Sequence, residues 1–139
     1  MADYTEEKRL VRSFIRKDRR DRLLFELTKA EKRYDGVSRF CHQADDFMDK
    51  SKIIMSGTDL NHRPEFLRFV RTRKDEKCYL LSPDYTLDGC TLPLPQAVEQ
   101  ASMNADAVVI LGSDFLIVFT EDFKGGSEKY LLCEDRKLC

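Results

Sequence analysis

The first half of the chain places hydrophobic residues at the spacing of an α-helix. The clearest case is the segment 37–48, where hydrophobic residues fall at i, i+3, i+4, i+7, i+10 and i+11. This spacing matches a period of about 3.6 residues and predicts an amphipathic helix with one buried face. Asp35 and Gly36 precede the segment and are residues that punctuate helices, so we expect this helix to begin at Val37.

Residues 5–28 predict two helices separated by a break. Thr5 can cap the first helix, and the hydrophobic residues within 10–15 then share one face. The leucines within 23–27 fall nearly opposite that face when the helix is continued at about 100° per residue. A single straight helix would therefore change its hydrophobic side midway, and we predict a break near Asp18.

Proline marks the start of two more predicted helices, because its fixed φ angle suits the first turn. One runs from Pro64 to about Lys74, with its large hydrophobic residues on a shared face. The other covers residues 94–103 and contains Pro95. Its hydrophobic residues recur at i, i+3, i+4 and i+7, as a half-buried helix requires.

From Cys78 onward the pattern changes to short hydrophobic runs bounded by turn residues, which is typical of β-strands. The predicted strands cover residues 78–82, 90–92, 107–111, 115–119 and 130–133. The third and fourth runs are hydrophobic at every position, so both faces of these strands must be covered. The turn between them is Gly112-Ser113-Asp114, and residues 124–127 provide the turn into the last strand.

These elements predict an α+β fold in one domain, residues 1–139, that is mainly helical over 1–76 and mainly strands with one helix over 77–139. We expect the N-terminal helices to pack on a mostly antiparallel sheet of four to five strands. The short helix 94–103 should cover the other face. The predicted core of the central strands is Val109, Leu111, Ile117 and Phe119.

Composition excludes two classes of protein. Hydrophobic residues make up 42% of the chain and charged residues 35%, a balance unlike that of a disordered chain or a lipid-embedded one. No stretch approaches the roughly 20 hydrophobic residues that cross a bilayer. Residues 1–17 are charged instead of carrying a hydrophobic signal segment. We therefore expect a cytoplasmic protein that does not associate with membranes.

The net charge of −1 conceals an asymmetry between the two parts of the chain. Residues 1–77 hold 20 Lys and Arg against 15 Asp and Glu, whereas residues 78–139 hold 4 against 10, giving +5 and −6. Two explanations remain open. The parts attract one another in the folded chain, or the basic part presents a face to a partner.

The five cysteines show no close spacing, so neither a zinc site nor a disulfide framework is predicted. Cys41, Cys78 and Cys133 lie in hydrophobic segments and are expected to be free, buried thiols. Cys41 and His42 are adjacent, but neighbouring helical residues point about 100° apart, so we do not expect a thiol–imidazole pair. His42 should instead face the aspartates at 45–46.

Other candidate chemistry also has ordinary structural explanations. Ser113 lacks the flanking pattern of a hydrolase nucleophile, and Gly125-Gly126 precedes a strand instead of a phosphate-binding helix. The acids expected in turns lack the spacing of a calcium loop. They are Asp84, Asp88, Asp114 and Asp122. We therefore expect no catalytic residue, no metal and no cofactor.

The most distinctive polar feature is a series of arginines at i, i+3, i+7, i+10 and i+11, namely Arg9, Arg12, Arg16, Arg19 and Arg20. On a continuous helix they would form one stripe opposite the hydrophobic residues of 10–15. The guanidinium group offers a rigid fork for carboxylate or phosphate. The stripe is explained by a solvated face paired with the protein's own acids, by an acidic protein partner, or by nucleic acid.

We hypothesise a non-enzymatic intracellular binding or regulatory module that recognises an acidic protein surface through these arginines. The alternative is a nucleic-acid-associated regulator that uses the same stripe. The isoelectric point near 6.1 and the lack of aromatic residues among the arginines count against that alternative. A third hypothesis is a small enzyme whose site cannot be recognised in the sequence.

Overall fold

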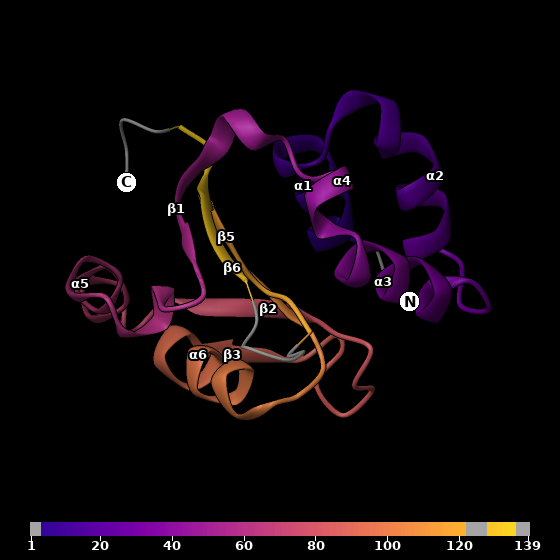
Figure 1. Ribbon diagram of the computed structural model, residues 1–139. Helices are drawn as coiled ribbons and strands as arrows, with labels where there is room; N and C mark the ends of the chain where they lie inside the picture. The colour runs from indigo at the N-terminus through magenta and orange to yellow at the C-terminus, as the bar shows by residue number, and fades with distance from the viewer. Residues whose placement is uncertain (1–3, 122–127, 136–139) are drawn as a thin grey trace.

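Strands from both halves of the chain form one antiparallel sheet with the order β1-β6-β5-β4-β2-β3 (Figure 1). The computed structural model describes residues 4–121 and 128–135. Within them the strands are β1 Ile53–Gly57, β2 Lys77–Leu81, β3 Thr91–Pro93, β4 Val108–Leu111, β5 Phe115–Phe119 and β6 Lys129–Cys133. The α+β class is confirmed, with six strands instead of the expected four to five. The predicted turn at 124–127 lies outside the described residues.

Strands β4 and β5 lie in the middle of the sheet and are buried at every position. Their side chains alternate between two hydrophobic clusters, because successive residues of a strand point to opposite faces. Val109 and Leu111 belong to one cluster, and Ile117 and Phe119 to the other. The predicted core of the central strands is therefore confirmed.

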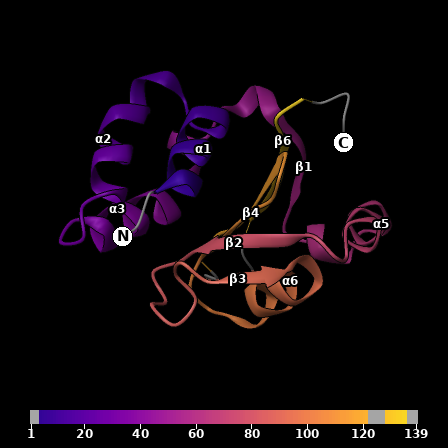
Figure 2. The same ribbon diagram turned by 180° about the vertical axis from the view of Figure 1, so that it is seen from behind.

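One face of the sheet is covered by the N-terminal helices, as predicted (Figure 2). These are α1 Thr5–Phe14, α2 Lys17–Leu27, α3 Arg33–His42 and the single turn α4 Ala44–Phe47. Short 3₁₀ turns at Lys50–Lys52 and Leu60–His62 flank β1. No helix in the described part of the chain has the length and hydrophobicity required to span a membrane.

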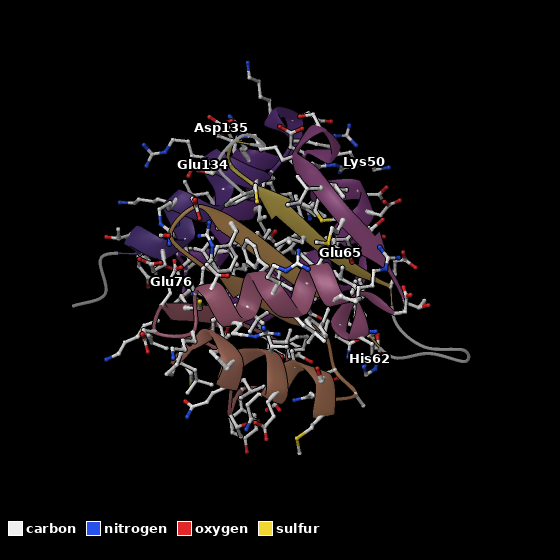
Figure 3. The ribbon with its side chains drawn as sticks, turned by 90° about the vertical axis from the view of Figure 1, so that its left-hand side faces the viewer. Lys50, His62, Glu65, Glu76, Glu134 and Asp135 are labelled. Carbon is white, nitrogen blue, oxygen red and sulfur yellow. The ribbon has the colours of Figure 1, made fainter. Side chains whose placement is uncertain are left out.

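The other face is covered by two helices, α5 Pro64–Thr72 and α6 Leu94–Met103. Figure 3 looks toward this side, with α5 lying across the sheet and α6 below it. Both helices begin with proline in the first turn, as predicted. The expectation that a single short helix covers this face is corrected, because α5 packs here and not with the N-terminal helices.

The break between the first two helices occurs at Ile15 and Arg16, close to the predicted position. Ile15 adopts an extended conformation and forms an isolated antiparallel bridge with Met48. Pairing with the segment after α4 thus replaces the helical hydrogen bonds at this point. The predicted cap is wrong in detail, since Thr5 is the first helical residue and the N-cap is Tyr4, without a side-chain cap.

The predicted helix 37–48 differs from the structure at both ends. The structure has α3 starting four residues earlier, at Arg33, and an interruption at Gln43 before α4. Gly36 therefore lies inside the helix. A Cβ at this position would be 2.7 Å from the Cβ of Glu26, so the glycine permits α2 and α3 to cross closely.

Strand β1 was not predicted from the sequence. It carries three hydrophobic residues in a row, too few to stand out, and its pairing with β6 has an irregularity between Ile53 and Met55. The strand occupies one edge of the sheet. Its position is set by the partner strand and by the helices on either side of it in the sequence.

Replacing Ile117 with alanine tests the two-sided burial of the central strands. The side chain is fully buried, so Ile117→Ala should lower the free energy of unfolding by about 2 to 5 kcal/mol. Ser113→Ala, at an exposed position in the neighbouring turn, should change it by less than about 0.5 kcal/mol. Urea denaturation followed by circular dichroism measures both, and equal losses would contradict the three-layer arrangement.

Candidate functional site

The five arginines singled out in the sequence do not lie on one continuous helix. Arg9 and Arg12 belong to α1, Arg16 lies in the break, and Arg19 and Arg20 belong to α2. The two helices turn back beside one another (Figure 2). The single stripe that a continuous helix would present is therefore divided into two sets with different surroundings.

Arg9 connects α1 to the turn between β4 and β5. Its Nη1 donates to the carbonyl oxygens of Gly112 at 2.6 Å and Ser113 at 3.1 Å. Its Nη2 pairs with Glu6 at 2.8 Å. The guanidinium group thus satisfies two backbone acceptors of the turn, and Arg9 has a role within the fold.

Arg20 satisfies the C-terminal end of α1. The last carbonyl groups of a helix have no partner within the helix. Arg20 Nε donates to the carbonyl oxygen of Ile15, the C-cap of α1, at 2.8 Å. This bond fixes the position of the guanidinium group and uses one of its donors.

Arg16 and Arg19 contact the short helix α4. Arg16 donates to the carbonyl oxygen of Asp46 at 3.2 Å and pairs with Asp18 at 3.0 Å. The guanidinium carbon of Arg19 lies 5.5 Å from the centre of the Phe47 ring, within the range of a cation–π contact. Both arginines remain exposed, so these contacts leave their charge accessible to solvent.

Arg12 borders a groove between α1 and α2 with a volume of about 330 Å³. The groove is lined by Lys8, Val11, Arg12, Arg20, Asp21 and Leu24. Lys8 and Arg12 are exposed, and their side chains make no hydrogen bond or ion pair within residues 4–121 and 128–135. Sequence reasoning missed Lys8, although it lies four residues before Arg12 and thus on the same helix face.

Two other arginines pair with acids of the acidic part of the chain. Arg33 pairs with Asp88 at 2.8 Å, and Arg73 pairs with Asp114 at 2.6 Å. The Arg73 guanidinium group also lies over an aromatic ring, 4.7 Å from the centre of Phe69. In the described part of the chain, none of the five N-terminal arginines forms an ion pair with an acid from residues 78–139.

Arg33 is the centre of a partly buried polar cluster between α1, α3 and β2. It pairs with Glu7 at 2.8 Å as well as with Asp88, and it donates to the Tyr79 hydroxyl oxygen at 3.1 Å. The Tyr79 hydroxyl in turn donates to Glu7. Burial, together with this hydrogen bond to Glu7, raises the pKa of Tyr79, so the phenol is a neutral donor.

Cys41 is buried in the helical layer, and burial raises the pKa of its thiol. Both nitrogens of the neighbouring His42 have other contacts, Nδ1 with the Ser38 carbonyl oxygen at 2.6 Å and Nε2 with Glu121 at 2.7 Å. The expected pairing of His42 with the aspartates at 45–46 is therefore corrected to Glu121. The helix is interrupted after His42, so the i+3 and i+4 positions do not follow it on the same helix.

Of the other two cysteines expected to be buried free thiols, one agrees with the expectation and one does not. Cys78 is buried and free, and burial raises the pKa of its thiol to about 12. Cys133 is also buried, but it is disulfide-bonded, so the expectation of a free thiol there is wrong. Cys90 is free and half-buried.

The predicted turn acids have structural partners. Asp88 and Asp114 pair with arginines, and Asp84 accepts from the backbone N–H of Thr86 at 2.9 Å. Asp122 and the glycine pair at 125–126 lie outside the described residues. Within the part of the chain that the structure describes, no three His, Cys, Asp or Glu side chains are grouped to hold a metal ion.

Comparison of the chain with protein-family models, curated proteins and solved structures finds no match. The chemical character of the candidate site therefore follows from its residues. It consists of exposed cations on α1 and α2 beside a groove with hydrophobic residues in its lining. Such a surface is suited to binding negatively charged groups.

The contacts of the arginines predict different stabilities for two variants. Arg9→Met removes charge-assisted hydrogen bonds to two carbonyl oxygens and should lower the free energy of unfolding by about 1.5 to 3 kcal/mol. Arg12→Met should change it by less than about 0.5 kcal/mol. Urea denaturation of both variants measures the difference, and equal effects would show that the Arg9 contacts do not support the fold.

Thiol reactivity should follow burial. Brief alkylation of the native protein near pH 8 should modify Cys90 ahead of Cys41 and Cys78, because a thiol with a raised pKa has little reactive thiolate. Mass spectrometry of tryptic peptides identifies the modified residue. In urea all three should react alike, and rapid native labelling of Cys41 would contradict its buried position.

Proposed function

We propose that this protein is a non-enzymatic binding module that recognises an acidic surface on another protein through the exposed basic residues of α1 and α2. The observation that carries this proposal is that some cations pair with acids of the chain's acidic part and others do not. Arg33 and Arg73 pair with acids of the acidic part of the chain, whereas Lys8 and Arg12 make no ion pair within the described residues. The charge of α1 is therefore available to a partner.

The surroundings of these cations favour a protein over a nucleic acid. Asp18 and Asp21 are exposed on α2 among the arginines, so this surface lacks the continuous row of positive charge that follows a phosphate backbone. The groove beside Arg12 also has hydrophobic residues in its lining, Val11 and Leu24, which suit a side chain and not a phosphate. The net charge of −1 supports the same conclusion.

The titratable groups favour binding over catalysis. Burial raises the pKa of Cys41 and of Tyr79, so both groups are held in their neutral forms. A nucleophile requires the opposite shift or an adjacent base. His42, the histidine nearest to Cys41 in sequence, is instead engaged by Ser38 and Glu121.

Charge reversal tests the proposal. Arg12→Glu combined with Arg19→Glu should weaken binding of the partner by at least about tenfold, because attraction to its acids becomes repulsion. Affinity capture from the source cells, with chemical cross-linking, identifies the partner and the segment bound. The cross-linked segment should be acidic, and raising the salt from about 0.05 M to about 0.3 M should reduce the difference between variant and unmodified protein.

A matched control removes the same amount of positive charge from the opposite side of the sheet. Arg71→Glu combined with Lys74→Glu changes two exposed cations at the end of α5 and should leave capture unchanged. Equal capture by all three proteins would overturn the proposal. Salt-sensitive binding to duplex DNA or RNA that only the α1–α2 variant loses would establish the nucleic-acid alternative instead.

A further inference from the structure

The groove between α1 and α2 combines a hydrophobic lining with positively charged borders. Val11 is 3% exposed and belongs to the core, whereas Leu24 is half-buried and packs against that core, so Leu24 provides most of the accessible hydrophobic surface of the groove. Lys8 and Arg12 come from α1, one helical turn apart, and Arg20 comes from α2. The cations therefore border the groove on both helices.

The cations of the groove outnumber its acids and keep donors available. Asp21 is the one acid among its lining residues. The side chains of Lys8 and Arg12 have no hydrogen-bond or ion-pair partner within residues 4–121 and 128–135. Arg20 uses Nε for the Ile15 carbonyl oxygen, which positions its two terminal nitrogens without engaging them in any hydrogen bond of the described part. Because these donors are already held in position, less conformational entropy is lost when they bind a carboxylate.

The size of the groove limits what it can hold. A volume of about 330 Å³ is near the lower end of the range of about 300 to 1,000 Å³ that is usual for ligand sites. This space suits one anchoring side chain and its neighbours, and not the face of a folded domain. The hydrophobic part of the lining favours a small apolar anchor such as an aliphatic side chain, and the cations around it favour carboxylates on adjacent residues.

We infer that this groove binds a short acidic segment of the partner protein in which one aliphatic side chain lies between carboxylates. The inference rests on the proposed function and specifies the chemistry of the segment that the module recognises. Asp21 adds selectivity, because it repels a segment made only of acidic residues more than a segment that places an uncharged residue in the groove.

Nuclear magnetic resonance with synthetic peptides tests this inference. The probe is a peptide with leucine between two pairs of glutamates, and the matched peptide has serine in place of leucine. Titration of the ¹⁵N-labelled protein to about 1 mM peptide detects even weak binding, with a dissociation constant of about 1 mM. The amide signals of Lys8, Arg12 and Leu24 should shift, and the serine peptide should bind about tenfold more weakly because it loses the hydrophobic contact.

Variants test separately the two contacts that the inference requires, the one with carboxylates and the one with the aliphatic side chain. Lys8→Glu combined with Arg12→Glu should abolish the shifts, whereas Arg71→Glu combined with Lys74→Glu should preserve them. Leu24→Gln should remove the preference for leucine over serine while leaving residual binding of both peptides. Circular dichroism confirms that each variant is folded, and the comparison of the two peptides on the unmodified protein does not depend on any variant.

The outcomes distinguish this inference from the proposed function. If signals elsewhere shift, or if leucine and serine peptides bind equally, the groove is not the site of an aliphatic anchor and the inference is overturned. The proposed function still stands in that case if charge reversal at Arg12 and Arg19 abolishes capture of an acidic partner. If no signal shifts and capture is also unaffected, both are overturned.

Discussion

Strands β4 and β5 carry a hydrophobic side chain at every position, and the need to cover both of their faces determines where the helices pack. Burial of each large side chain contributes about 1.5 to 3 kcal/mol, so leaving one face open would forfeit much of the stability of a small domain. Helices α1–α4 cover one face, and α5 and α6 cover the other. The basic surface of α1 and α2 is the outer side of a layer that exists for this reason.

The helical layer is fixed to the sheet by polar contacts as well as by packing. Glu7 is 3% exposed, and a buried carboxylate without a partner is strongly destabilising. Arg33 and the Tyr79 hydroxyl supply its partners, and Asp88 supplies the second charge for Arg33. Arg9 makes a similar connection at the β4–β5 turn. These contacts orient α1, and with it the face that carries Lys8 and Arg12.

The sequence was sufficient to predict the elements whose hydrophobic pattern is long or continuous. Helices α5 and α6 and the strands from β2 to β6 fall close to their predicted positions, because their patterns are local. Strand β1 and the interior position of Gly36 were not predictable in this way. The first depends on pairing with a strand far along the chain, and the second on the close crossing of α2 and α3.

The candidate site was only partly predictable for a related reason. The spacing of the arginines predicted one basic stripe, but the role of each arginine depends on partners that the spacing does not contain. Arg9 contacts a carbonyl group 103 residues away, and Arg33 finds its acid 55 residues away. Arg12 is distinguished from them by having no such partner in the described residues, a property that only the folded arrangement reveals.

The edge strand β1 has a consequence for how the chain assembles. Its partner β6 begins at Lys129, 72 residues after β1 ends at Gly57. At a synthesis rate of about 5 to 20 residues per second, roughly 4 to 14 seconds pass between the emergence of the two strands from the ribosome. During that interval β1 has no strand to pair with, although β2 to β5 are made before β6. The last strand to be made therefore completes the first, and the rate of folding depends on closing this long loop.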